Sequence, residues 1–288
     1  MRFELFVATR YLRAKRRQAF IGVITGISIL GVAAGVASLI VALAINNGFR
    51  QDLQARLLGS TAHISLLRVE SDGMRDWRPL LEKLSKQPHV VAAAPAIYEQ
   101  VLISRGPRAR GAVLKGMLPQ YERKVSDLLQ SVTLGSAAAL EVNNANSNAD
   151  ANTPPAESPD DLTGVQQRVA AMPPIILGKD MADEIGATVG SVVLVTSPQG
   201  ELTPFGMVPK YIRFHVAGIF NSGFFDYDSS WAFIRLSDAQ QLFGLGDVIS
   251  VIQFKLDDIY LAGDVARALE QAADLISGSH GFMATSWM

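Results

Sequence analysis

The sequence contains no cysteine among its 288 residues. This absence excludes a disulfide framework, a thiolate nucleophile and any zinc site that depends on cysteine ligands. The sequence also lacks an excess of positive charge, because its formal net charge is −1. A protein that binds nucleic acid normally carries a strongly basic face, so the charge balance argues against nucleic acid as a partner.

Catalytic motifs are missing as well. Residues 177–180 (LGKD) lack the glycine-rich cradle and the hydroxyl of a phosphate-binding loop, and no Gly-x-Ser-x-Gly elbow occurs. Asp257 and Asp258 are adjacent and would point to opposite sides of a strand, which is poor geometry for an acid–base pair. The four histidines are not at zinc-ligand spacings: His63, His89, His215 and His280. We therefore predict no catalytic, metal-binding or cofactor-binding residues, and the chain is not expected to be an enzyme.

One long stretch has no charge at all. Residues 20–45 contain no Asp, Glu, Lys, Arg, His or Pro, and the mean hydropathy of the chain is +0.20. As a helix, this stretch covers about 39 Å, which exceeds the roughly 30 Å hydrocarbon core of a bilayer. Residues 1–19 carry a net charge of +5, so the remainder carries −6. Because positive flanks stay in the cytoplasm, we predict a cytoplasmic segment 1–19, a transmembrane helix 20–45 and an external body 46–288.

Two details of the apolar stretch leave alternatives open. Ala42-Leu43-Ala44 resembles the cleavage site of a secretory signal, but signal cores span about 7–15 residues, which favours an uncleaved anchor. Glycine pairs four residues apart leave a groove that another helix can approach, although glycine is also common in membrane helices generally. The predicted helix-packing residues are Gly22, Gly26, Gly31 and Gly35. Residues 3–12 predict a short helix lying along the inner leaflet.

The body alternates strand-like and helix-like segments, which indicates an α+β fold of two lobes. The predicted strands are 61–69, 90–104, 110–115, 174–178, 190–196, 211–220, 231–236, 248–256 and 281–287. The predicted helices are 46–58 (a stalk), 77–86, 120–129, 179–185, 237–243 with Ser237 as its cap, and 261–275. Residues 136–167, rich in Asn, Ala, Pro and Asp, predict a disordered insert, and 190–236 a β-rich second lobe.

Several segments also carry a family resemblance. They are 4–49, Ile176–Gly178 with Met181 and Ala182, the stretch from Gly190 onward, 209–243 (PKYIRFHVAGIFNSGFFDYDSSWAFIRLSDAQQLF) and 284–288. Together they resemble the LolC/LolE lipoprotein-releasing permeases, which belong to the wider MacB-like class of ABC transporter permeases. The resemblance implies one N-terminal transmembrane helix followed by a two-lobed MacB-like periplasmic core domain.

The resemblance also implies a function and a set of partners. Such a permease subunit sits in the bacterial inner membrane, contacts membrane lipid, and lifts lipoprotein substrates from the outer leaflet. A cytoplasmic ATPase (LolD-like) hydrolyses ATP, and a periplasmic carrier (LolA-like) receives the lipoprotein. A second permease subunit, or a second copy of the same one, completes the assembly. The alternative is a mechanotransmission or scaffold subunit of the FtsX or MacB type.

In the LolC branch a protruding β-hairpin, the hook, captures the carrier, and its position corresponds to the predicted loop 198–209. The hook residues that the resemblance implies are Leu202, Thr203, Pro204, Phe205, Gly206, Met207, Val208 and Pro209. Exposed apolar residues on a proline-containing turn are natural anchors for a partner's groove, because prolines lower the ordering cost of binding. The alternative is that Phe205 folds back onto its own domain.

Polar residues near the base of the hook form a second carrier contact in the family. Lys210 and Arg213 are the candidates here, but Tyr211 and Ile212 depart from the expected polar pattern. The family also has three later membrane helices and a cytoplasmic loop, which the sequence lacks after Met288. We therefore expect a fragment, a truncated product or a split gene. The sequence leaves open whether this is the carrier-binding or the lipoprotein-loading half, and of a homodimer or a heterodimer.

Overall fold

The computed structural model describes residues 2–13, 19–60, 62–69, 73–141, 169, 172–203, 206–278 and 281–286. The chain divides into two compact units, Met1–Leu57 and Leu58–Met288. Each unit is described by itself below.

The first unit consists of helices α1 (Arg2–Arg13) and most of α2 (Ala19–Ser60). The absence of proline from residues 20–45, together with many alanines and leucines, lets α2 run for 42 residues without a break. Within the described part of the chain, its segment Gly22–Phe49 is the one helix long and apolar enough to cross a membrane, and none of that segment is buried. The short N-terminal helix and the helical continuation beyond residue 45 are both confirmed.

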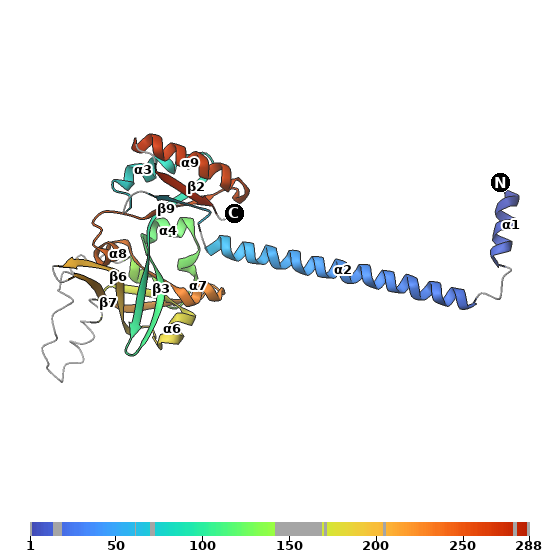
Figure 1. Cartoon of the computed structure of the whole chain (residues 1–288), viewed down its shortest axis with the longest axis horizontal. Helices are drawn as coiled ribbons and strands as arrows, with labels where there is room; N and C mark the ends of the chain where they lie inside the picture. The colour runs from blue at the N-terminus through green and yellow to red at the C-terminus, as the bar shows by residue number, and fades with distance from the viewer. Residues whose placement is uncertain are drawn as a thin grey trace. The chain divides into compact units, whose positions relative to one another are not determined.

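The second unit is built on one hydrogen-bonded sheet in the order β10-β1-β9-β2-β3-β8-β5-β7-β4, with β6 paired to both β2 and β7 (Figure 1). The strands are β1 (Ile64–Arg68), β2 (Val90–Arg105), β3 (Arg108–Met117), β4 (Val132–Gly135), β5 (Pro174–Gly178), β6 (Val192–Thr203), β7 (Gly206–Phe220), β8 (Trp231–Arg235), β9 (Val251–Leu256) and β10 (Phe282–Ser286). The helices are α3 (Trp77–Leu84), α4 (Pro119–Val125), α6 (Lys179–Ile185), α7 (Phe225–Ser230), α8 (Leu236–Phe243) and α9 (Ala262–Ser277), with short 3₁₀ helices at Leu128–Ser131, Ala137–Leu140 and Ile259–Leu261.

The first lobe of this unit is an open sheet. Strands β10, β1, β9 and the first half of β2 pair antiparallel, and helices α3 and α9 contact the sheet and each other. Because side chains alternate between the faces of a strand, Ala93 joins the main core while Ala92 and Ala94 pack with Val125 of α4. The open sheet therefore has helical cover on both faces.

The second lobe is a closed barrel. Strand β2 pairs with β3, β3 with β8, β8 with β5, β5 with β7, β7 with β6, and β6 again with β2. A closed ring leaves no free sheet edge over its length. Alternate residues fill its interior, for example Ile175 and Leu177 of β5 and Phe214 of β7, all fully buried. The barrel combines the strands of residues 190–236 with β3, β5 and the second half of β2.

Short helices lie at opposite ends of the barrel. Strands β5 and β8 are antiparallel, so the helices that directly follow them, α6 and α8, lie at opposite ends (Figure 1). Helix α8 contacts β2, β3, β6, β7 and β8. A Cβ on Gly116 of β3 would lie 2.4 Å from the Cβ of Ala239, so the glycine permits this close approach. The predicted Ser237 cap is wrong, because α8 begins at Leu236 directly after β8 and Arg235 occupies the cap position.

The predicted insert 136–167 begins too early. Residues 136–141 are described, with Ser136 capping the 3₁₀ helix Ala137–Leu140 and Leu140 only 2% exposed. Leu140 packs in a cluster with Ile176 and Phe233 on the outside of the barrel, and this contact fixes the position of the segment before residue 142. Residues 142–168 lie outside the described residues. Two short elements, β4 and α7, were not predicted because four to six residues carry too little periodicity.

Candidate functional site

The region predicted as a loop, 198–209, is largely strand. Strands β6 and β7 form a hairpin in which pairing runs from Val192 opposite His215 to Thr203 opposite Gly206. The loop predicted from prolines and glycines is wrong, because such residues are tolerated where a strand has only one neighbour. The pairing agrees instead with the β-hairpin that the family resemblance implies at this position. Pro204 and Phe205, which join the two strands, lie outside the described residues.

The outer part of this hairpin projects beyond the barrel, and we call residues 197–203 and 206–210 the arm. Strand β6 pairs with β2 only at Leu194, Val195 and Thr196, and beyond them it pairs with β7 alone. At the base of the arm, Ser197 pairs with Lys210 and the next pair is Glu201 with Val208. Three residues therefore oppose Pro209, which makes a bulge that bends and twists the arm. Because β5 and β7 are parallel, the arm lies at the α8 end of the barrel (Figure 1).

A strip of barrel surface that no described helix covers adjoins the arm, and we call it the bare face. Its first row runs across three strands through Leu102, Thr196 and Tyr211, and its second through Ser104, Leu194 and Arg213. Leu102 is 45% exposed and Tyr211 49%, and Val208 on the arm is 51% exposed. Two apolar side chains of the first row are thus about half exposed, whereas alternation along β7 places Val208 on the opposite face of the strand from Tyr211. Alternation along three strands could have predicted this face, but only their pairing shows that its rows align.

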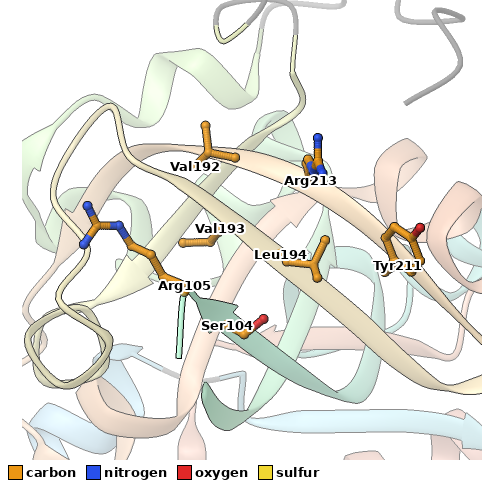
Figure 2. A pocket seen from close by; sticks show the side chains of 8 residues that line it. Ser104, Arg105, Val192, Val193, Leu194, Tyr211 and Arg213 are labelled. Carbon is orange, nitrogen blue, oxygen red and sulfur yellow. The ribbon is translucent and has the colours of Figure 1, made fainter. Parts of the chain in front are cut away.

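The bare face holds a shallow pocket of about 430 Å³ (Figure 2). It is lined by Ser104, Arg105, Gly106, Val192, Val193, Leu194, Tyr211 and Arg213. Arg105 donates a hydrogen bond to the carbonyl of Gly186, so it also ties β2 to the end of α6. In Figure 2, Arg105 lies to the left of Leu194, and Arg213, on the neighbouring strand, lies above it. An apolar floor flanked by guanidinium groups suits recognition of a protein surface.

The two residues proposed as a second contact occupy different environments. Lys210 is half-buried at the base of the arm, opposite Ser197. Arg213 is exposed and lines the pocket of the bare face. Tyr211, between them in sequence, presents its ring on the outside of the barrel, while Ile212 packs against the core. Of the two residues that depart from the expected polar pattern, Tyr211 therefore adds partly apolar surface next to Arg213.

The glycine pairs of α2 lie on two faces of the helix. At about 100° per residue, Gly22 and Gly26 are rotated by about 180° from Gly31 and Gly35. A Cβ built on any of the four would meet nothing within 4 Å. The predicted packing face thus becomes two opposite faces, and its use in helix packing stays a prediction.

The histidines lie in separate structural positions. His63 is buried and its Nδ1 accepts the backbone N–H of Leu256 at 3.1 Å, whereas the Nδ1 of His215 lies 2.7 Å from the carbonyl of Met172. His89 faces Asp257, and this interaction holds the pKa of the Asp257 carboxyl below its usual value. His280 lies outside the described residues. Within the described ranges, no three His, Asp or Glu side chains are placed to hold a metal ion.

Comparison with known proteins shows the family of the chain. Residues 25–272 match the family described as the MacB-like periplasmic core domain. The chain is 32% identical to the lipoprotein-releasing system transmembrane protein LolC of Neisseria meningitidis, over 88% of this chain and 54% of that protein. It is 34% identical to LolC of Xylella fastidiosa, over 91% of this chain and 56% of that protein. The crystal structure of the periplasmic region of MacB from Actinobacillus actinomycetemcomitans aligns with a TM-score of 0.43 and 14% identity, covering 80% of this chain and 90% of that one.

The chain therefore belongs to the family of MacB-like periplasmic core domains. Within that class it is similar to the LolC proteins along almost its whole length, which confirms the resemblance carried by its sequence motifs. It spans about half the length of these curated relatives.

Proposed function

We propose that this chain is the membrane-anchored, periplasmic part of an ABC-type permease that releases lipoproteins from the bacterial inner membrane. Helix α2 anchors it, and the body lies on the periplasmic side. The arm docks a periplasmic lipoprotein carrier, with Lys210 and Arg213 as a second contact. A separate cytoplasmic ATPase supplies the energy, and a second permease subunit or copy completes the assembly. The observation that carries the proposal is the arm beside the bare face, in a chain similar to LolC.

The arm has the physical properties of a docking element. Its two strands are hydrogen-bonded to each other, so little conformational entropy is lost when a partner binds. Val208 is half-exposed and therefore has apolar area available to a partner's groove. Among the described residues each strand of the arm pairs only with the other, and a partner could add a strand beside such a hairpin.

Matched substitutions test the docking assignment. Val208→Asp in the full chain should reduce capture of a purified LolA-like carrier roughly tenfold or more, because it places a charge in an apolar contact. Leu275→Asp is the control, since Leu275 is 84% exposed on α9 in the other lobe, and it should capture normally. Phe205→Asp should behave as Val208→Asp does. Equal capture by the unmodified chain and by all three variants would contradict the docking assignment. Binding of a peptidoglycan-hydrolase regulator, without capture of the carrier, would favour the scaffold alternative.

The orientation has its own test. Residues 1–19 carry +5 and precede the apolar segment, so they should remain in the cytoplasm. Protease added to intact spheroplasts should then digest the body. Protection of the body until the cells are opened would reverse the orientation, and the transport function would fail with it.

A further inference from the structure

A pair of opposite charges is fully buried between β3 and α4. Lys115 is 1% exposed and Glu122 is 0% exposed, and the Lys115 Nζ lies 2.6 Å from the Glu122 Oε1. The hydroxyl of Ser126 donates to the same carboxylate oxygen at 2.5 Å. Burying two charges costs so much solvation that such a pair rarely adds net stability. The presence of this buried pair therefore needs an explanation other than a gain in stability.

Aromatic and polar side chains from four further elements, β2, β9, β8 and α7, lie around this pair. Burial raises the pKa of Tyr98 well above its usual value, so its hydroxyl stays protonated, and Gln253 of β9 hydrogen-bonds to it. The Lys115 Nζ lies 5.7 Å from the centroid of the Tyr98 ring. Trp231 packs edge-on against Tyr98 at 5.4 Å, and Tyr227 of α7 stacks on Trp231 at 4.5 Å. We call Lys115, Glu122, Ser126, Tyr98 and Gln253 the junction cluster.

The junction cluster lies where the two lobes meet. Strand β2 pairs with β9 of the open sheet up to Ala96, and with β3 of the barrel from Ala96 onward. Tyr98, two residues past this point, is opposite Lys115 in the β2–β3 ladder. The Tyr98 N–H also donates to the hydroxyl of Ser250, just before β9. The cluster thus draws residues from the barrel, from the open sheet and from α4.

The same helix contacts the start of the body. Ala62, the first described residue after α2, packs against the small cluster formed by Ala92, Ala94 and Val125. Val125 lies three residues from Glu122, so α4 contacts the point where the chain leaves α2 and also carries the carboxylate that binds the barrel. A displacement at Ala62 therefore has a direct route to β3.

We propose that the junction cluster holds the barrel at one angle to the open sheet, and that α4 thereby couples the start of the body to the arm. Hydrogen bonds and ion pairs in a buried network are satisfied in only a narrow range of geometries, whereas purely apolar contacts tolerate sliding. Glu122 and Lys115 act as positioning residues. The inference concerns the body alone and stands whether or not a carrier docks.

The absence of cysteine makes a direct measurement possible. Leu275→Cys on α9 and Leu134→Cys on β4 place two spin labels on exposed sites, one in each lobe of the otherwise intact full chain. Pulsed electron-spin resonance then gives the distribution of distances between the lobes. In the variant that also carries Lys115→Met and Glu122→Met, we expect a distribution about twofold broader, because methionines fill the space without directional bonds.

A second buried pair within one lobe provides the matched control. Arg235 and Asp238 are about as buried and are joined by a 2.7 Å contact, but both belong to the barrel and α8. Replacing them with Met and Leu should leave the distance distribution unchanged. Glu122→Gln keeps the volume and weakens the network, so it should broaden the distribution to an intermediate extent. An unchanged distribution in a folded Lys115→Met/Glu122→Met variant overturns the proposal, and if that variant does not fold, an unchanged distribution in Glu122→Gln does so.

Discussion

The barrel has two outer faces whose strands share the same alternation of apolar residues, but one face is covered and the other is partly exposed. On the side of β5, β7 and β8, outward residues such as Ile176, Phe220 and Phe233 are covered by Leu128, Leu129 and Leu140 of the 3₁₀ helices. On the side of β2, β6 and β7, the outward residues Leu102 and Tyr211 remain about half exposed. The comparison teaches that apolar alternation specifies a face, and that the connecting segments decide whether this face is buried or stays exposed.

The largest effect is expected on the covered face. Phe220 is fully buried, and its ring centroid lies 4.6 Å from that of Phe233. Phe220→Ala should lower the free energy of unfolding by about 3–5 kcal/mol, because it leaves a cavity that the sheet cannot close. Urea denaturation of the full chain in detergent measures this loss. A loss of less than about 1 kcal/mol would mean that the covered face contributes little to the core.

A smaller effect is expected where α8 closes the barrel. Gly116→Ala places a methyl group 2.4 Å from the Cβ of Ala239, and should lower the free energy of unfolding by about 1–3 kcal/mol through overpacking. Gly111→Ala is the control on the same strand, because its added Cβ meets nothing within 4 Å. Equal stability of the two variants would show that α8 can shift without cost.

The smallest effect on stability is expected on the bare face. Tyr211→Ala should change the free energy of unfolding by less than about 0.5 kcal/mol, because the ring is half exposed. The same substitution should weaken carrier binding by about 1 kcal/mol, roughly fivefold, if the face extends the docking surface of the arm. Tyr260→Ala, at a 71% exposed tyrosine in the other lobe, should leave carrier binding unaltered. A stability loss without a binding loss would assign Tyr211 to the fold.

Local sequence signals identified most elements, because their periodicity is strong. The strand 174–178 and the helix 179–185 have the predicted boundaries, with Gly186 in the left-handed conformation that ends the helix. The closure of the barrel could not be predicted, since it depends on three residue pairs between β2 and β6, about ninety residues apart in sequence. The prolines of the arm indicate a turn, so the local sequence does not reveal its strands, and the family resemblance alone predicts the hairpin.

The junction cluster could not be predicted from the sequence for a different reason. Lys115 ends a predicted strand and Glu122 lies in a predicted helix, and charged residues at such positions are usually solvated. Their burial depends on tertiary contacts, in which α4 packs against β2 and β9 and Tyr98 of β2 lies against Lys115. A lysine directly after the apolar residues 112–114 was the available signal, and it is weak by itself.

The pairing of Ile64 with Ser286 brings the beginning and the end of the body together at one edge of the open sheet. Paired residues of antiparallel strands lie about 5 Å apart, so Ile64 and Ser286 lie close together although 222 positions separate them in the sequence. A domain with adjoining ends can be grafted into a loop of an unrelated host, or circularised by a short linker, without disturbing its interior. Residues 64–286 could therefore be transferred into another protein as one unit, with the barrel and the arm intact.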